Sequence, residues 1–379
     1  MNEKNSKNVN ILKKTFKEYY FSYFNLLELP EKINKREFGF MSFDDIINRH
    51  ISFNNMGELN VYLLKNIPSD IYCSNAVYEF PTFPINEKQL LGAELIFDMD
   101  LKDFNLPCQN DHSYYICKRC NNVYHDISTI CSSCKEKTSL TIIPCYKCNY
   151  ALKLEIKKLI SYLVEDFGIN KNNVNIYFSG NTGFHVHVVD ENYFTLDAKG
   201  RSDLVGYLLG KDLLVESLGV RASKYGYNIR IPISGLTFGW RKRILTKLKI
   251  KDVTNKKLSY YVKKIGGYNS FKQQITLITS ELAVKIDPQV TTDIHRIFRM
   301  PGSLNSKSSL TKVRIENLDK FNPLDDACFI TDKENIDISV KTPLTIKLKK
   351  KKYSISVGSN NVPVNLGVFL ITKGFADMI

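Results

Sequence analysis

The sequence predicts an α/β (α+β) fold in which a core sheet carries insertions. Three observations predict it: short apolar runs typical of buried strands, stretches with helical spacing between them, and one segment crowded with cysteines. The 379 residues suffice for one large domain with insertions, or for about two or three ordinary domains. Hydrophobic residues make up 43% and charged residues 24% of the chain, which is typical of a globular protein and argues against wholesale disorder.

Three regions near the start of the chain have the patterns of regular elements. Residues 11–24 place apolar and aromatic side chains at mixed spacings of three and four, which predicts an amphipathic helix. Residues 35–53 alternate aromatic and polar residues, which is more typical of short strands and turns. The apolar run at residues 93–97 predicts a buried strand that continues straight into Asp98 and Asp100.

The middle of the chain contributes a helix, two strands and a longer helical region. Residues 149–167 have helical spacing, and Gly168 is well placed to end that helix. Residues 174–178 and 184–189 predict strands on either side of a glycine-containing turn. From about residue 200 to residue 284 the pattern is mostly helical.

The bulk properties narrow the class of protein. No run of about 18 apolar residues is present, so we expect no membrane span. The polar start MNEKNSKNVN lacks the features of a secretory signal peptide, and we expect an intracellular protein. The net charge of +14 favours a polyanionic partner such as nucleic acid, although a generally lysine-rich composition would give the same excess. The motifs must decide between these two interpretations.

Asp98 and Asp100 form the first candidate site. Two residues apart at the end of a strand, they project from one face with Cα atoms about 6–7 Å apart. Carboxylates held this way repel each other and gain by sharing Mg²⁺ or Mn²⁺, and two such ions about 4 Å apart can drive phosphoryl-group chemistry. The alternative is a pair of solvent-facing aspartates in a turn. Asp287, which follows the apolar run 282–286, is the best candidate for a third carboxylate.

The turn between the two predicted strands is a candidate phosphate site. Gly180 and Gly183 allow backbone N–H groups to approach a phosphate closely. Ser179 and His185 can donate hydrogen bonds to the same anion, and His187 lies on the same strand face as His185. The alternative is a plain hairpin turn with a satisfied histidine.

A basic segment follows Asp287. Arg296 and Arg299 are three residues apart and Lys307 follows, and arginine pairs suit triphosphate oxygens because the guanidinium binds bidentately. The alternative is an ordinary basic surface loop. The position beside Asp287 favours a site in which acids hold metals while bases hold phosphates.

Seven of the nine cysteines lie between Cys108 and Cys148, a clustering that indicates metal binding in a reducing compartment rather than disulfides. One set has the spacing of a zinc ribbon, in which two C-x-x-C knuckles complete a tetrahedron. Its members are Cys117, Cys120, Cys131 and Cys134. A second set could close another site at the base of the same segment. Its members are Cys108, His112, Cys145 and Cys148. With four protein ligands each, both sites would be structural, and Cys73 and Cys328 would be buried apolar residues.

Taken in order, these motifs resemble the small subunit of DNA primases of the archaeal–eukaryotic type. The resemblance covers roughly residues 9–330. The central motifs are Asp98-x-Asp100, a cysteine segment, a helix, Ser179-Gly180-x-x-Gly183-x-His185, and Asp287-x-x-Val290-x-x-Asp293-x-x-Arg296-x-x-Arg299-x-Pro301-x-Ser303. The N-terminal ones are Arg36-Glu37-Phe38, Arg49 with Ser52-Phe53, and Ser74 to Tyr78.

The resemblance implies a fold and a set of site residues. It implies a mixed-sheet catalytic core over residues 1–379, with a zinc-binding insertion at 108–148 and a mostly helical insertion at 200–284. Two catalytic Mg²⁺ or Mn²⁺ ions would be bound by Asp98, Asp100 and Asp287. The nucleotide site would include Ser179, Gly180, Gly183, His185, Arg296, Arg299 and Lys307, with Arg36 and Arg49 lining the cleft. In the family a knuckle precedes the helix, as Cys145 and Cys148 do here, which makes the ribbon an additional insertion and the number of zinc ions one or two.

Two positions depart from the family pattern. Thr182 stands where the turn usually has an arginine, and Asn305 stands where a histidine usually follows leucine. Each lost phosphate contact of this kind costs about 1.5–3 kcal/mol. Arg296, Lys307 or a basic residue near Trp240 are candidates to compensate.

The activity implied by the resemblance is the synthesis of short RNA or DNA primers on single-stranded DNA by two-metal nucleotidyl transfer, which initiates DNA replication. Nucleoside triphosphates are the expected substrates, a primase large subunit is the expected partner, and an archaeal location would be cytoplasmic. Two alternatives stay open. One is a catalytically weakened zinc-containing nucleic-acid-binding relative, and the other is a stand-alone primase-polymerase of a mobile element.

Overall fold

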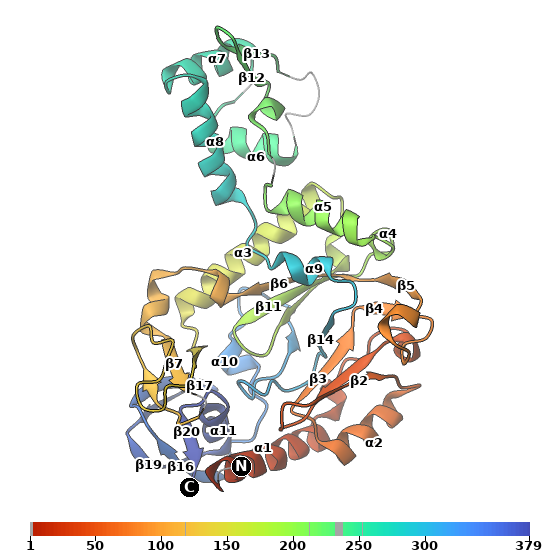
Figure 1. Ribbon diagram of the computed structural model, residues 1–379, viewed down its shortest axis with the longest axis vertical. Helices are drawn as coiled ribbons and strands as arrows, with labels where there is room; N and C mark the ends of the chain where they lie inside the picture. Colours follow the sequence, from red (N-terminus) through yellow and green to blue (C-terminus); the bar gives the residue numbers. More distant parts are fainter. Residues whose placement is uncertain (1–2, 118, 212, 232–237, 252) are drawn as a thin grey trace.

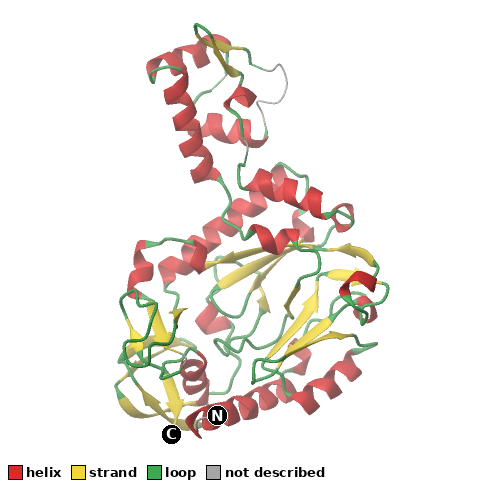
Figure 2. Cartoon of the chain, viewed as in Figure 1, coloured by secondary structure: helices red, strands yellow, loops and turns green. Residues whose placement is uncertain are grey.

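The computed structural model describes residues 3–117, 119–211, 213–231, 238–251 and 253–379. Helices and strands are both abundant and are mixed along the chain, as the sequence predicts (Figure 2). Every pairing between named strands in these ranges is antiparallel, so the expected mixed sheet is in fact a set of antiparallel sheets. Consecutive strands here are joined mostly by turns and short connections, which favour antiparallel pairing.

Two four-stranded sheets form the centre of the molecule. The first has the order β15 (Val313–Arg314), β10 (Val174–Phe178), β11 (Gly183–Val188) and β6 (Leu95–Asp100). The second has the order β14 (Ile297–Arg299), β3 (Asp70–Ser74), β1 (Phe38–Met41) and β2 (Ile47–Ile51). Residues of both sheets line one cavity of about 290 Å³, so the sheets face each other across it.

Helices cover the outer faces of both sheets (Figure 1). The long helix α3 (Tyr146–Glu165) packs apolar residues against β6 and β11 in the larger hydrophobic core. Helices α1 (Glu3–Ser22) and α2 (Met56–Asn66) cover the second sheet through a separate core that includes Phe16, Phe38 and Leu63. The short helix α9 (Pro288–Thr292) lies against β6 and α5 (Ala198–Leu208).

A cysteine-bearing module and the C-terminal region lie together beside the core (Figure 1). The module holds β7 (Ser113–Cys117), β8 (Val123–Tyr124) and β9 (Thr138–Ile142). The C-terminal elements are β16 (Asn335–Val340), β17 (Leu344–Leu348), β18 (Lys351–Ile355), β19 (Gly358–Pro363), α11 (Val364–Thr372) and β20 (Ala376–Met378). Asp377 accepts hydrogen bonds from Asn8 at 3.0 Å and from Asn121 at 2.8 Å, which ties the module to both ends of the chain.

A helical lobe projects from the body of the molecule (Figure 1). Its elements are β12 (Val220–Ser223), β13 (Gly226–Ile229), α6 (Gly239–Lys247), α7 (Asn255–Lys264) and α8 (Tyr268–Leu282). Parts of the predicted helical stretch, namely residues 212, 232–237 and 252, lie outside the described ranges. The remaining short elements are β4 (Ala76–Tyr78), β5 (Leu90–Ala93), α4 (Glu191–Phe194) and α10 (Pro323–Asp326).

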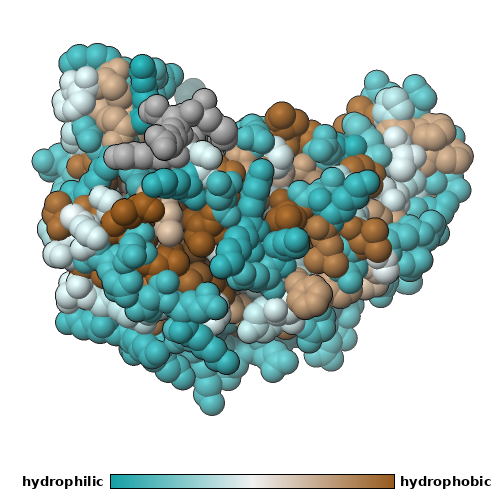
Figure 3. Space-filling model, turned by 90° about the horizontal axis from the view of Figure 1, so that it is seen from below, coloured by the Kyte–Doolittle hydropathy of each residue, from teal (hydrophilic) through white to brown (hydrophobic). Residues whose placement is uncertain are grey.

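The surface is largely polar. The face seen from the side of α1 is mostly hydrophilic, with scattered hydrophobic residues (Figure 3). Of the helices in the described ranges, none combines the length and the apolar character needed to cross a membrane.

Candidate active site and zinc centres

Strand β6 presents two carboxylates on one face, as the sequence predicts. Leu95, Phe97 and Met99 are buried against α3 on one side of the strand, whereas Asp98 and Asp100 alternate with them and are only partly buried. Asp287 is the residue that caps the N-terminus of α9, and its backbone N–H donates to the carbonyl oxygen of Asp98 at 3.0 Å. The fold therefore brings the third predicted carboxylate to the end of β6.

The electrostatics of Asp98 reflect this grouping. Its pKa is raised to about 7, first because the carboxyl is buried and then because Asp100 and Asp287 add negative charge. Lys102 and Arg296 act in the opposite direction. Oxygen-rich acidic groups of this kind fit Mg²⁺ or Mn²⁺, whose charge would offset the repulsion. The oxygens of all three carboxylates do not lie within 4.8 Å of one another, so the group is an open one.

The glycine turn adjoins the same carboxylates. Gly183 pairs in register with Asp100, and a Cβ at Gly183 would lie 2.6 Å from the carbonyl oxygen of Met99, so only glycine allows this approach. Gly180 has a φ of 89°, in the left-handed region. Ser179 closes the turn, since its N–H donates to the Gly183 carbonyl at 2.9 Å. The turn is thus held beside the metal-site candidates.

A buried lysine that the sequence analysis missed stands between the two strand histidines. The Nζ of Lys312 lies 3.1 Å from Nδ1 of His185 and 3.3 Å from Nε2 of His187, and Lys312 is 0% exposed. Burial lowers the pKa of Lys312 to about 7 and holds the pKa of both histidines well below the usual range. Nε2 of His185 is 3.4 Å from Asp98, so this cluster contacts the acidic group. Lys312 belongs to no motif, although it directly precedes strand β15.

The predicted basic residues are spread around these groups. Arg299, on β14, donates to Asp70 at 2.5 Å and to the carbonyl of Leu304 at 2.7 Å, which fixes its guanidinium in the wall between the sheets. Arg296 is partly buried and close enough to lower the pKa of Asp98, whereas Lys307 is exposed.

Arg36 and Arg49 are held by acidic residues rather than left open. Arg36 is 3% exposed; it donates to the carbonyl of Asn75 at 2.7 Å and pairs with Glu94 at 2.5 Å. It lines the inter-sheet cavity together with Arg299. Arg49 pairs with Glu37 at 2.9 Å and does not line that cavity. The three aspartates lie beside the cavity, not in its lining.

The two positions that depart from the family pattern have partners within the chain. The hydroxyl of Thr182 donates to a carboxylate oxygen of Asp100 at 2.8 Å. The side-chain oxygen of Asn305 accepts the backbone N–H of Lys307 at 2.9 Å. Both residues are therefore built into the local hydrogen bonding.

The C-terminal region also reaches the glycine turn. Lys373, which follows α11, donates to the side chain of Asn181 at 2.6 Å and to the carbonyl of Ile142 at 3.2 Å. Burial lowers its pKa to about 8, Asp100 raises it, and Lys307 lowers it further. Sequence reasoning missed this residue, because the signal is a single lysine that lies far along the chain from every motif.

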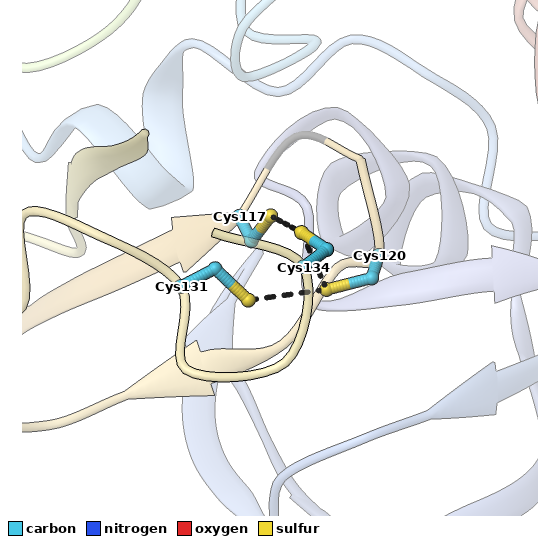
Figure 4. A group of neighbouring side chains, drawn as sticks. All are labelled: Cys117, Cys120, Cys131 and Cys134. Carbon is cyan, nitrogen blue, oxygen red and sulfur yellow. Dashed lines mark hydrogen bonds between the residues drawn. The ribbon is translucent and has the colours of Figure 1, made fainter. Parts of the chain in front are cut away.

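The ribbon cysteines converge as predicted. Cys117, Cys120, Cys131 and Cys134 place all four sulfur atoms within 4.8 Å of one another (Figure 4). The closest pairs, Cys117 with Cys134 and Cys120 with Cys131, are 3.4 Å apart. Four thiolates at these separations fit tetrahedral zinc with Zn–S bonds of about 2.3 Å.

The second set converges only in part. The sulfur atoms of Cys108, Cys145 and Cys148 lie 3.6–3.9 Å apart. The expectation that His112 completes this group is not met, since it does not join the three sulfurs within 4.8 Å. The backbone fixes it elsewhere: its N–H donates to the carbonyl of Gln109, and its own carbonyl accepts from Ile143. As expected, Cys73 and Cys328 are buried.

Comparisons with known proteins place this geometry in context. The family described as DNA primase small subunit matches residues 143–316. The DNA primase small subunit PriS of Nitrosopumilus maritimus is 37% identical, covering 99% of this chain and 100% of that protein. PriS of Cenarchaeum symbiosum is 34% identical, with coverage of 98% and 99%. PriS of Archaeoglobus fulgidus is 33% identical, with coverage of 97% for each.

Among solved structures, the polymerase domain of Mycobacterium tuberculosis ligase D in complex with DNA aligns with a TM-score of 0.38 at 9% identity. The alignment covers 81% of this chain and 83% of that one. This likeness is too weak to support an argument about the fold or the site.

Proposed function

The chain belongs to the archaeal-type DNA primase small-subunit family, and from this premise we propose that Asp98, Asp100 and Asp287 form its catalytic metal site. As a primase small subunit the protein is a nucleotidyltransferase that makes primers for DNA replication. The observation that carries the proposal is the hydrogen bond from Asp287 to Asp98, which joins distant acidic motifs at one strand end. Bound there, two divalent ions would activate the attacking hydroxyl and neutralise the triphosphate charge.

The phosphate side of the site is assigned to the groups next to these carboxylates. Ser179 and the backbone N–H groups at Gly180 and Gly183 offer donors to triphosphate oxygens, and His185 adds its ring beside Asp98. Because burial keeps His185 neutral, it acts as a hydrogen-bond donor or acceptor and not as a fixed cation. Positioning and charge neutralisation supply most of the catalysis in this chemistry.

The arginines and the exposed lysine have different parts in the proposal. Arg296 and Lys307 remain open to the incoming nucleotide, since the ion pairs recorded among the described residues do not include either of them. Arg299 binds phosphate from its fixed place in the cavity wall. Arg36 and Arg49, whose guanidinium groups are occupied by Glu94 and Glu37, shape the cleft and orient neighbours.

We assign two insertions to the single catalytic domain of residues 1–379. Residues 108–148 form the zinc-binding insertion, with the ribbon as a complete site and the three-cysteine group as a second site that lacks a fourth protein ligand. The helical insertion, expected at 200–284, is proposed to begin after α5, because that helix packs against α9 on the body. As a small subunit, the chain would act with a large subunit on single-stranded DNA and nucleoside triphosphates.

A primer-synthesis assay on single-stranded DNA tests the proposal. With Mg²⁺ or Mn²⁺ and the large subunit, the wild-type chain should make primers, whereas Asp98→Ala should make none and still bind template. Circular dichroism should show that Asp98→Ala remains folded. Synthesis by the Asp98→Ala protein at the wild-type rate would contradict the metal-site assignment.

A further inference from the structure

The helical lobe carries most of the excess positive charge of the chain. Residues 209–284 contain 15 lysines and arginines against four aspartates and glutamates, a net charge of +11 out of the +14 of the whole protein. The lobe stands out from the body, away from β6 and α9 (Figure 1). A charge this concentrated creates a local field that attracts a polyanion.

The ion pairs of the lobe lie where it meets the body, not at its tip. Lys242 and Arg243 pair with Glu165 of α3, and Lys247 pairs with Glu281. In the part of the chain that the structure describes, no carboxylate lies within ion-pair distance of Lys224 at the tip. The same holds for the α7 lysines at 256, 263 and 264 within those ranges. The tip therefore presents cations whose charge is not offset by a neighbour.

Helix α7 sorts its residues into an apolar face and a basic aromatic face. Leu258 and Val262 are buried, whereas Lys256, Tyr260 and Lys263 recur at spacings of four and three on the exposed side. The side chain of Tyr260 is 71% exposed, so its ring has an open face between two lysines. A large aromatic ring left in water in this way has no role in the core.

The neighbouring hairpin adds a second aromatic–lysine pair. Tyr225, in the turn between β12 and β13, is 91% exposed, and Lys224 lies 5.6 Å from the centre of its ring. Strand β13 and α7 enclose a shallow hollow of about 470 Å³, lined by Asn228, Lys256, Tyr260 and other residues of the two elements. Tyr227 fixes the two elements to each other, since its hydroxyl donates to the carbonyl of Ser259 at 3.3 Å.

We propose that the tip of this lobe, formed by Lys224, Tyr225, Lys256, Tyr260 and Lys263, binds the single-stranded template outside the catalytic centre. Exposed rings stack on bases of any sequence, and lysines beside them neutralise the backbone phosphates. An acidic protein partner would use the lysines but would leave the two rings without a function. The inference rests on the proposed function for its occupant, and it gives the lobe the task of holding template strand while the carboxylate site extends the primer.

Equilibrium binding of the full chain to fluorescein-labelled oligodeoxythymidine, with no added divalent metal or nucleotide, tests this inference. Lys256→Glu/Lys263→Glu should raise Kd about tenfold and reduce the salt dependence by about 0.7 per lost phosphate contact. Tyr260→Ala should raise Kd about fivefold or more, and Tyr260→Phe should restore most of the affinity because the stacking ring is kept.

Matched controls separate local from general effects. Lys7→Glu/Lys17→Glu makes the same charge change on exposed residues of α1 at the far end of the molecule, and it should leave Kd within about twofold of wild type. Asp98→Ala should bind like wild type, so a failure of the catalytic proposal leaves this test intact. Primer synthesis by the Lys256→Glu/Lys263→Glu protein should show a raised KM for template with kcat kept.

Three results would overturn the inference. The first is a lobe variant that binds no worse than the α1 control. The second is a loss of affinity in Tyr260→Phe equal to that in Tyr260→Ala. The third is unchanged DNA binding together with lost association with the large subunit, which would assign the tip to a protein contact.

Discussion

The backbone N–H of Asp287 donates a hydrogen bond to the carbonyl oxygen of Asp98 at 3.0 Å. This bond fixes the first turn of α9 against the end of β6, and with it the carboxylate that caps the helix. Because Asp287 also raises the pKa of Asp98, the two side chains interact electrostatically as well as through the backbone. The acidic group is therefore strained by like charge in the absence of a cation.

Replacing Asp98 by Asn should stabilise the protein and abolish its activity. The neutral amide relieves the repulsion from Asp100 and Asp287 in a partly buried site, which should raise the free energy of unfolding by about 1 kcal/mol without divalent metal. Urea unfolding measures the gain, and a primer-synthesis assay measures the loss. Saturating Mn²⁺ should stabilise the wild type but not Asp98→Asn, and equal stabilisation of both would argue against metal binding here.

Lys312 should give the protein a characteristic pH dependence. Its folded-state pKa of about 7 lies below its ordinary value of 10.5, so the folded protein binds fewer protons between these limits and stability rises with pH. Relative to Lys312→Met, the unfolding free energy of wild type should increase by up to about 1.4 kcal/mol per pH unit between about pH 7 and 10. Parallel curves for the two proteins over that range would contradict a buried, uncharged lysine.

The two cysteine groups should bind zinc independently. Cys117→Ser and Cys145→Ser should each lower the zinc content from two ions per chain to one, because each removes a thiolate from a different group. His112→Ala is the matched control and should keep both ions, since the histidine lies outside the three-cysteine group. Metal analysis by mass spectrometry gives the count, and loss of an ion in His112→Ala would restore His112 as a ligand.

Lys373 should affect nucleotide binding from the C-terminal region. Lys373→Met removes the hydrogen bond to Asn181 that holds the glycine turn, and it removes a positive charge near Asp100. We expect KM for nucleoside triphosphate to rise about tenfold with a smaller change in kcat, the loss typical of one charge-assisted hydrogen bond. Lys373→Arg should retain more of the affinity, and an unchanged KM in Lys373→Met would leave the residue with a purely structural role.

Local patterns in the sequence were enough to predict several elements closely. The strand predicted at residues 174–178 is observed as β10 with the same bounds, and the helix predicted at 149–167 is observed at Tyr146–Glu165. The strand that carries Asp98 and Asp100, and the four ribbon cysteines, also follow from short-range spacing. Side-chain periodicity and ligand spacing are properties of neighbouring residues, so they survive without knowledge of the fold.

The tertiary structure alone decided which distant residues share the site. The sequence nominated Asp287, but only the packing of α9 on β6 places it beside Asp98. Lys312 and Lys373 carry no motif, and they reach His185 and Asn181 because β15 and α11 happen to end there. In the same way, His112 has the right spacing for a zinc ligand, but its backbone hydrogen bonds turn it away. Such contacts depend on how whole elements pack, and that information is distributed over the chain rather than written near any one residue.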